Sequence, residues 1–259
     1  MIWHLNNTTI RNPGRYLEAL RAYENYGFIE GIFDIGNTDS QKELYNLLLD
    51  AGVMSSDKRD SAWNGRKWRL GFRELGLISY KNETKEKQGS ITKTGKALLN
   101  VSNDAELEDV YLRIIYNLEM RKKGMSFRPI PLILNVIKLL REAGLKDSIN
   151  QVEYSISIQD FRPHFTFEDY FNEIVEFRKK VDLNKGNLKI FYEDTFKEVY
   201  KRNNNTPSIA TFSKDYPDVT FRLLKLSGLF RLEGSKLILN SQYNKLLDVL
   251  CTDKDASSS

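Results

Sequence analysis

The stretch of sequence that decides the fold reads Leu75-Gly76-Leu77-Ile78-Ser79-Tyr80-Lys81, returns as Ser90-Ile91-Thr92-Lys93 and continues as Thr94-Gly95-Lys96-Ala97-Leu98-Leu99. A glycine after a helical run closes the helix in the left-handed conformation, and the apolar residue that follows packs back on the last turn. The alternating residues on both sides of the polar segment 82–89 predict the two strands of a hairpin. The stretch therefore predicts a helix, a β-hairpin and a second helix.

The same order of signals returns near the C-terminus. Gly228 is followed by Leu229-Phe230-Arg231-Leu232, the turn Glu233-Gly234-Ser235, the strand Lys236-Leu237-Ile238-Leu239-Asn240 and a helical stretch, 243–250. Helical runs also end at Gly52 and Gly144. A helix–turn–helix followed by a hairpin is the plan of a winged helix. We therefore expect a mainly α fold with small β-hairpins, of the α+β class, built from tandem winged-helix units.

These patterns also predict the domain boundaries. Residues 1–125 would form an N-terminal arm and the first winged-helix unit, residues 126–252 a second winged-helix-like unit, and residues 253–259 a flexible polar tail. The polar tail carries no apolar pattern that would hold it to a core, so we expect it to fray.

Three sequence signals predict where helices begin. Ser40 with Glu43 has the spacing of a capping box. Thr166 precedes two acidic residues that favour a first helical turn. Asp215 stands before Pro217, which suits the first turn of a helix, so we expect Asp215 to cap that helix.

The composition is that of a globular protein. Of 259 residues, 41% are hydrophobic and 12% aromatic, which argues against a disordered chain. No apolar run reaches the roughly 18–20 residues that a membrane span requires, and the first residues lack a signal-peptide pattern, so we expect a cytoplasmic protein. Cys251 is the single cysteine, and with only His4 and His164 beside it a disulfide framework and a Cys/His zinc cluster are excluded.

Positive charge is concentrated in one segment. The whole chain has 39 Lys and Arg against 35 Asp and Glu, a net charge of +4. Residues 55–100 alone carry eleven basic and five acidic side chains, a local charge of +6. Such a concentrated field is what a polyanionic partner would need, although a solvated surface gives the same pattern.

The helix expected over residues 62–75 carries two stripes. Trp68, Phe72 and Leu75 fall at i, i+4 and i+7 and form an apolar stripe for the core. Arg66, Arg69 and Arg73 fall at i, i+3 and i+7 and form a basic row that we expect on the far side. Three guanidiniums in a row repel one another, so stability alone does not explain them, whereas phosphates or guanine edges would.

In a winged helix, this helix usually enters the major groove of DNA. The candidates for base contacts are Asn64, Arg66, Lys67, Arg69 and Arg73. Trp63 and Leu70 also project towards the basic side, and Gly65 and Gly71 fit a close approach of another backbone. The alternative interpretation is a surface helix with scattered arginines.

Candidates for phosphate contacts lie beside this helix, in the hairpin turn and near the expected unit boundary. They are Lys58, Arg59, Lys85, Lys87, Arg121, Lys122, Lys123 and Arg128. Hairpin tips and linkers are also charged for solubility, so a solvated surface remains the alternative. In the second unit, the helix from Pro217 offers only Arg222 and Lys225 as basic side chains. We therefore expect that unit to dock on the DNA more than it contacts specific bases.

The N-terminal sequence Trp3-x-Leu5-x-Asn7-Thr8-Thr9-Ile10-Arg11-Asn12-Pro13 resembles the opening motif of the AlwI family of type II restriction endonucleases, and its Asn-Pro step is similar to the start of FokI-like type IIS enzymes. The resemblance covers about residues 3–250. It implies recognition of a short, asymmetric site in double-stranded DNA, with cleavage outside that site by a separate C-terminal Mg²⁺-dependent domain. It also implies an arm that contacts DNA through Asn7, Arg11 and Asn12, which could instead lock the arm against the first unit.

A catalytic site is not expected in this chain. The nuclease core that the resemblance implies uses an Asp and an acidic-x-Lys triplet to hold a metal ion and activate water. Glu83-Thr84-Lys85 has the form of that triplet, but it lies in the hairpin turn, where nothing holds it beside an aspartate. We expect no metal site here, and we expect Mg²⁺ to belong to a cleavage domain or subunit outside this chain.

The sequence therefore predicts the DNA-recognition module of a type II, IIS-like or nicking restriction endonuclease, and leaves open whether the chain is itself an enzyme. One alternative is a winged-helix replication initiator or transcription regulator, which would bind repeated or palindromic sites as a dimer. The other is a scaffold whose winged helices contact proteins, which would not bind DNA at physiological salt.

Overall fold

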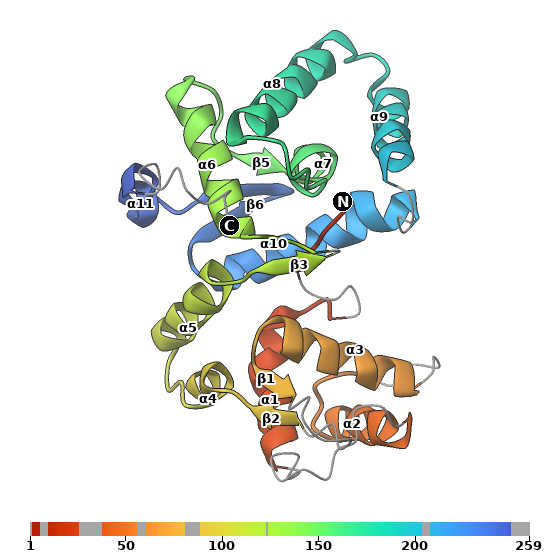
Figure 1. Ribbon diagram of the computed structural model, residues 1–259, viewed down its shortest axis with the longest axis vertical. Coiled ribbons are helices and arrows are strands. Elements are labelled where there is room, and N and C mark those ends of the chain that lie inside the picture. Colours follow the sequence, from red (N-terminus) through yellow and green to blue (C-terminus); the bar gives the residue numbers. More distant parts are fainter. Residues whose placement is uncertain are drawn as a thin grey trace. The chain divides into compact units, whose positions relative to one another are not determined.

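The computed structural model divides the chain into two units (Figure 1). The structure describes residues 2–5, 10–25, 38–55, 61–80, 89–122, 124–203 and 208–249. The N-terminal unit comprises residues 6–115, and the C-terminal unit comprises residues 1–5 together with 116–259. Both units are mainly helical with short antiparallel strands, which confirms the α+β class.

The N-terminal unit combines helices with one hairpin. Its elements are η1 (Pro13–Arg15), α1 (Tyr16–Asn25), α2 (Thr38–Asp50), α3 (Ser61–Glu74), β1 (Ile78–Tyr80), β2 (Gly89–Ile91), α4 (Lys93–Leu99) and α5 (Asp104–Tyr116). Aromatic rings from α1 and α3 meet in its core: Tyr16 lies edge-on to Trp68 with ring centroids 5.6 Å apart, and Tyr23 lies 5.7 Å from Phe72. The apolar stripe predicted for α3 therefore faces α1.

The predicted glycine caps are confirmed. The four glycines share positive φ values between 63° and 69°: Gly52, Gly76, Gly144 and Gly228. Beyond Gly76, the N–H of Leu77 donates to the carbonyl of Phe72 at 2.8 Å, which is the bond expected when a left-handed residue ends a helix. The cap turns the chain from α3 directly into β1.

The first predicted hairpin is confirmed as well. β1 and β2 run antiparallel, with Ile78 opposite Ile91. Its turn residues, 81–88, lie outside the described residues. The helix α4 follows at once, because the side-chain oxygen of Thr92 accepts a hydrogen bond from the N–H of Gly95 at 3.0 Å and caps its first turn.

The C-terminal unit is larger and contains two short π-helices. Its elements are β3 (Met120–Lys122), β4 (Met125–Phe127), α6 (Pro129–Glu142), β5 (Ile149–Asn150), α7 (Gln151–Glu153), the π-helix η3 (Tyr154–Ile158), α8 (Phe167–Leu183), α9 (Leu188–Arg202), the π-helix η4 (Thr211–Asp215), α10 (Tyr216–Leu226), β6 (Phe230–Glu233), β7 (Lys236–Leu239), η5 (Ser241–Tyr243) and α11 (Asn244–Val249). The apolar helix α6 supplies much of the core, with Ile133, Ile137 and Leu140 fully buried.

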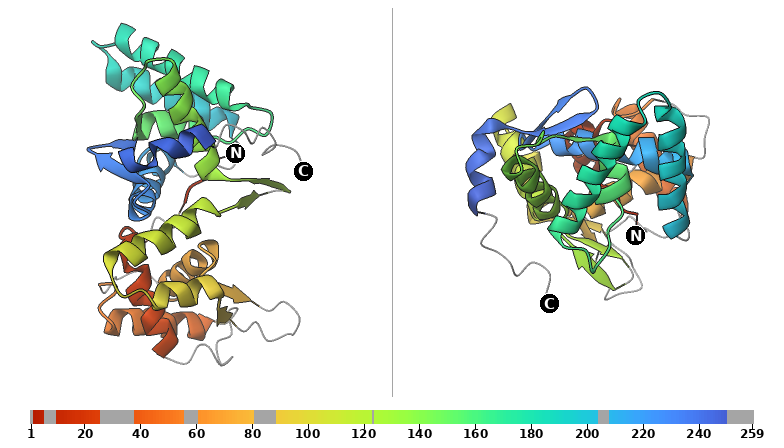
Figure 2. Two further views of the ribbon diagram at one scale, coloured as in Figure 1. Left: turned by 90° about the vertical axis from the view of Figure 1, so that its left-hand side faces the viewer. Right: turned by 90° about the horizontal axis from the view of Figure 1, so that it is seen from above.

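A three-stranded antiparallel sheet in the order β5-β7-β6 lies beside these helices. The predicted hairpin β6–β7 forms, with Phe230 opposite Leu239. The strand β5, which pairs Ile149 with Leu237, and the antiparallel hairpin β3–β4 were not predicted. The helices α8 and α9 are inserted between η3 and η4, and Figure 2 shows this pair from two further sides.

Residues 2–5 are built into the C-terminal unit. Trp3 is 2% exposed; its indole Nε1–H donates to the carbonyl of Ile158 at 2.7 Å. The hydroxyl of Thr220 in α10 accepts from the N–H of Leu5 at 3.1 Å and donates to its carbonyl at 3.2 Å. Both polar groups of the Leu5 backbone are thus satisfied by one buried side chain.

This docking changes the predicted division of the chain. Sequence analysis assigned residues 1–125 to the first unit, whereas residues 1–5 belong to the C-terminal unit and the N-terminal unit ends at residue 115. The reason is that Trp3 and Leu5 bond to residues 155 and 215 positions away, and no local pattern indicates such contacts. The predicted tail, 253–259, lies outside the described residues.

Of the three predicted capping residues, one makes its capping bonds. At the start of α8, Thr166 Oγ1 accepts from the N–H of Asp169 at 3.2 Å while the Asp169 carboxylate accepts from the N–H of Thr166 at 2.8 Å. Ser40 instead lies inside α2, which already includes Thr38. The helix α10 begins directly after Asp215 with Pro217 in its first turn, as predicted, but Asp215 makes no side-chain capping bond because η4 runs directly into α10.

We expect Thr220→Val to lower the free energy of unfolding of the C-terminal unit by about 1–3 kcal/mol, because it leaves the buried N–H and carbonyl of Leu5 without that partner while keeping the side-chain shape. Urea denaturation followed by tryptophan fluorescence would measure the change. Thr195→Val is the matched control, since the Thr195 hydroxyl donates to the carbonyl of Phe191 one turn back in its own helix. An equal loss in both variants would show that the Leu5 contact is not special.

Candidate nucleic-acid interface

Two glycines fix how α3 is seated in the N-terminal unit. A Cβ atom on Gly65 would lie 1.9 Å from the backbone oxygen of Gln41 in α2. A Cβ atom on Gly71 would lie 2.2 Å from the hydroxyl oxygen of Tyr16 in α1. Only glycine allows approaches this close, so the face of α3 that holds Gly65 and Gly71 is the inward face.

The apolar stripe of α3 lies on this inward face, as predicted. Trp68 and Phe72 are buried, and Leu75 just beyond the helix is buried with them. Burial raises the pKa of Tyr16, whose ring lies against Trp68, well above its ordinary value, and the nearby carboxylate of Glu74 raises it further. The Tyr16 hydroxyl therefore stays protonated and belongs to the core.

Two of the predicted basic side chains are exposed on the opposite side. Arg66 and Arg73 are exposed, and within the described part of the chain Arg66 has no ion-pair partner. Lys67 is half-buried, and its Nζ lies 4.9 Å from the centroid of the Trp63 ring. The outward face of α3 thus carries three cations and one carboxylate, Glu74.

The expectation that Asn64 and Arg69 also face outward is not met. Asn64 is 1% exposed and Arg69 is 8% exposed. At about 100° per residue, Arg69 lies about 60° around the helix from Arg66, towards Gly65 and the seat on α2. The predicted row of three arginines is therefore a row of two.

The structure places only some of the predicted phosphate contacts. Arg11 is exposed, and Asn12 is exposed but accepts a hydrogen bond from the N–H of Gly14 at 3.2 Å, so it caps η1. Arg128 donates to the carbonyl of Tyr116 at 2.8 Å. Arg121 and Lys122 lie in β3, and the structure describes only their backbone. The remaining candidates lie outside the described residues: Asn7, Lys58, Arg59, Lys85, Lys87 and Lys123.

In the C-terminal unit, α10 also exposes two cations. Arg222 is exposed, and its Nε donates to both carboxylate oxygens of Asp218 at 3.0 Å. Lys225 is exposed on the same helix. An aspartate one turn away thus pairs with one of the two exposed cations of α10.

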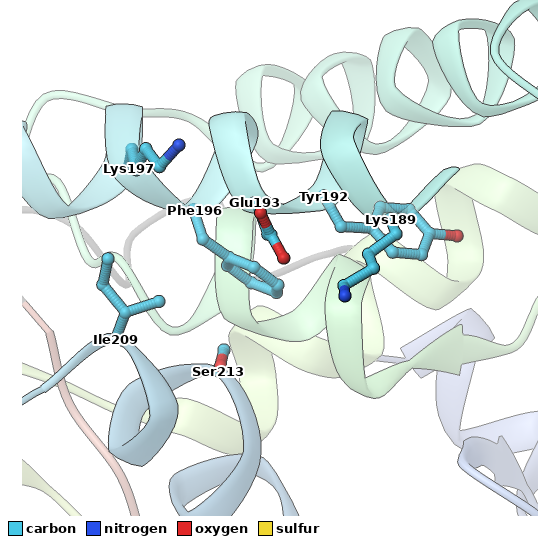
Figure 3. A pocket seen from close by; sticks show the side chains of 7 residues that line it. All are labelled: Lys189, Tyr192, Glu193, Phe196, Lys197, Ile209 and Ser213. Atoms are coloured by element: carbon cyan, nitrogen blue, oxygen red, sulfur yellow. The ribbon is translucent and has the colours of Figure 1, made fainter. Parts of the chain in front are cut away.

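Sequence analysis did not identify a hollow of about 460 Å³ between α9 and the start of η4 (Figure 3). It is lined by Lys189, Tyr192, Glu193, Phe196, Lys197, Ile209 and Ser213. Lys189, Glu193 and Phe196 point from α9 towards η4, whereas Lys197 is paired with Asp194 at 3.0 Å. No spacing signal in the sequence relates residues 209 and 213 to α9, since the contact forms only in the folded unit.

The described residues hold neither a cluster of metal ligands nor a membrane-spanning helix. They contain no group of three or more His, Cys, Asp or Glu side chains that could hold a metal ion. Glu83-Thr84-Lys85 lies outside them. None of the described helices combines the length and the apolar character that a membrane crossing needs.

Comparisons with known proteins agree with this architecture. A model of the family described as AlwI restriction endonuclease matches residues 73–257. The chain is also similar to the BpuJ1 endonuclease binding domain, whose crystal structure contains pyrene- and phenanthrene-modified DNA. The sequence identity is 14% and the TM-score 0.55, over 90% of this chain and 80% of that chain, so the two share a fold. None of the curated proteins matches the sequence significantly.

We expect Gly65→Ala to destabilise the N-terminal unit by about 1–3 kcal/mol although alanine is the better helix former, because the new methyl group collides with backbone that cannot move aside. Thermal unfolding followed by circular dichroism would measure it. Gly186→Ala is the control, because a Cβ atom there would meet nothing within 4 Å. A Gly65→Ala protein as stable as the parent would mean that α3 is not held against α2 in this way.

Proposed function

Since this chain belongs to the AlwI restriction endonuclease family, we propose that it recognises a short site in double-stranded DNA. The observation that carries the proposal is the outward face of α3, where Arg66, Lys67 and Arg73 stand opposite the buried stripe. We interpret the order α1, α2, α3, β1, β2 as a winged helix. In that plan the helix before the hairpin lies in the major groove.

The spacing on α3 suits a duplex. Arg66 and Arg73 are seven residues apart, which is about 10 Å along a helix axis and close to three base-pair steps. A guanidinium contacts the O6 and N7 atoms of guanine with two parallel hydrogen bonds, and it binds phosphate in the same geometry. Arg66 and Arg73 would therefore contact base edges or phosphates at two positions of one site.

The two units differ in ways that favour an asymmetric site. In the N-terminal unit the helix before the hairpin exposes two arginines, whereas in the C-terminal unit α10 pairs Arg222 with Asp218. One chain with two different units has no internal symmetry to match a palindrome. We infer that the N-terminal unit reads bases and that the C-terminal unit adds backbone contacts.

We assign DNA cleavage to residues other than those that the structure describes. Mg²⁺-dependent hydrolysis needs carboxylates that converge on a metal ion, and the described residues hold no such group. We propose that a cleavage domain or subunit other than these residues supplies the metal and cuts or nicks outside the recognised site, as in type IIS-like enzymes. A restriction enzyme meets incoming DNA in the cytoplasm, so we propose that location.

Selection from a pool of random duplexes tests recognition directly. We expect one short, non-palindromic sequence to be enriched and bound by a single chain, and incubation of that duplex with Mg²⁺ tests cleavage separately. A dimer on repeated or palindromic sites would favour a replication initiator or regulator instead. Failure to enrich any sequence would rule out sequence recognition.

The salt dependence of affinity tests the electrostatic part of the proposal. If about six phosphates are neutralised, the logarithm of the association constant is expected to fall against the logarithm of salt concentration with a slope near −5. Fluorescence anisotropy with a labelled duplex between about 50 and 200 mM salt measures it. Binding that does not change with salt would remove the claim of phosphate contacts.

We expect Arg66→Ala and Arg73→Ala each to weaken binding to the selected duplex by about 1–3 kcal/mol. Arg113→Ala is the matched control, because Arg113 lies in α5 of the same unit, is mostly exposed and is paired with Asp109 at 2.8 Å. All three variants lose one positive charge. An equal effect in all three would attribute binding to overall charge and not to the face of α3.

A further inference from the structure

The outward face of α3 has an apolar row between its charged rows. Residues seven apart lie almost in line along a helix. Arg66 and Arg73 form one such row, Lys67 and Glu74 form another, and between them lie Trp63 and Leu70. Trp63 and Leu70 are half-buried, unlike the fully enclosed ring of Phe72 on the inward face.

This apolar row does not belong to the core around Trp68 and Phe72. The seats of Gly65 and Gly71 on α2 and α1 fix the rotation of the helix, so Leu70 cannot turn inward. Leu70 follows Arg66 by four residues and precedes Arg73 by three, which places its side chain next to both arginines on the helix surface. A group that the two arginines reach therefore also comes close to Leu70.

The major groove of DNA offers one kind of apolar group to a protein, the 5-methyl group of thymine. We propose that Leu70 contacts the 5-methyl group of a thymine within the recognised site and is thereby a specificity-determining residue. The inference rests on the proposed function, since it requires α3 to lie in the major groove. It goes further by assigning an apolar contact, and with it a base, to a side chain that carries no hydrogen-bonding group.

The arrangement of charge around Leu70 favours this role. Two cations flank it on one side, and Lys67 lies on the other beside Glu74, with its ammonium group near the Trp63 ring, so three cations surround it against one carboxylate. Cations at the edges bring the helix to the polyanion, and an apolar side chain between them then meets the base edges. When the methyl group packs against Leu70, its apolar surface is removed from water, which is favourable. This favours thymine over any base that presents a polar group at that position.

The test removes only the methyl group. In the duplex selected by the unaltered chain, each thymine is replaced in turn by deoxyuridine, which keeps every hydrogen-bonding group. At one position we expect the affinity of the unaltered chain to fall about fourfold, as for loss of one buried methyl group. With Leu70→Ala we expect thymine and uracil at that position to bind equally.

The control variant is Leu183→Ala, in which the changed side chain is 85% exposed and lies in the C-terminal unit, and it is expected to prefer thymine as the unaltered chain does. If Leu70→Ala proves unfolded by circular dichroism, Leu70→Val takes its place and is expected to show a reduced preference. Overturning results are a selected site without thymine, a preference for thymine that survives in the Leu70 variants, or no preference in the unaltered chain. Failure to select any site refutes the proposed function itself and is thus distinguishable.

Discussion

The approach of Gly65 to the carbonyl of Gln41 is the contact on which the rest of the N-terminal unit depends. It brings the backbones of α3 and α2 closer than any side chain would allow, and Gly71 does the same against the Tyr16 hydroxyl. Because two glycines allow these close approaches at two points, the rotation of α3 about its own axis is fixed. That rotation directs Trp68 inward and Arg66 outward. The position of the basic surface is therefore a consequence of the steric fit between α3 and its neighbours.

Local sequence signals predicted the parts of the fold that depend on local physics. Glycine caps and hairpin alternation act within a few residues, and they identified the ends of α3 and α10 and the hairpins β1–β2 and β6–β7, but not the hairpin β3–β4. The site was predicted less well because the width of a buried helical face depends on its neighbours. An i, i+3, i+7 spacing groups Arg69 with Arg66, but Arg69 lies towards the side of Gly65 and is buried. The strand β5 is only two residues long and carries no periodicity at all.

In the C-terminal unit, an ion pair with additional hydrogen bonds joins the inserted helix α8 to the core. The carboxylate of Glu153 is 4% exposed and accepts from Arg178 Nε of α8 at 2.8 Å. The same guanidinium donates to the carbonyls of Lys146 and Ser148 on the way into β5. Removal of either partner would leave the other charge buried and unpaired. The ion pair between Glu153 and Arg178 therefore fixes the position of α8 and also stabilises it there.

The docking of residues 2–5 has a consequence for biosynthesis. The Thr220 hydroxyl that receives Leu5 is synthesised 215 residues after it, a delay of roughly 10 to 40 seconds at usual rates of translation. The N-terminal unit can fold during that interval. The indole of Trp3 stays exposed to water until the rest of the C-terminal unit has been synthesised and covers it. The C-terminal unit is thus completed by a segment made well before the helix that receives it.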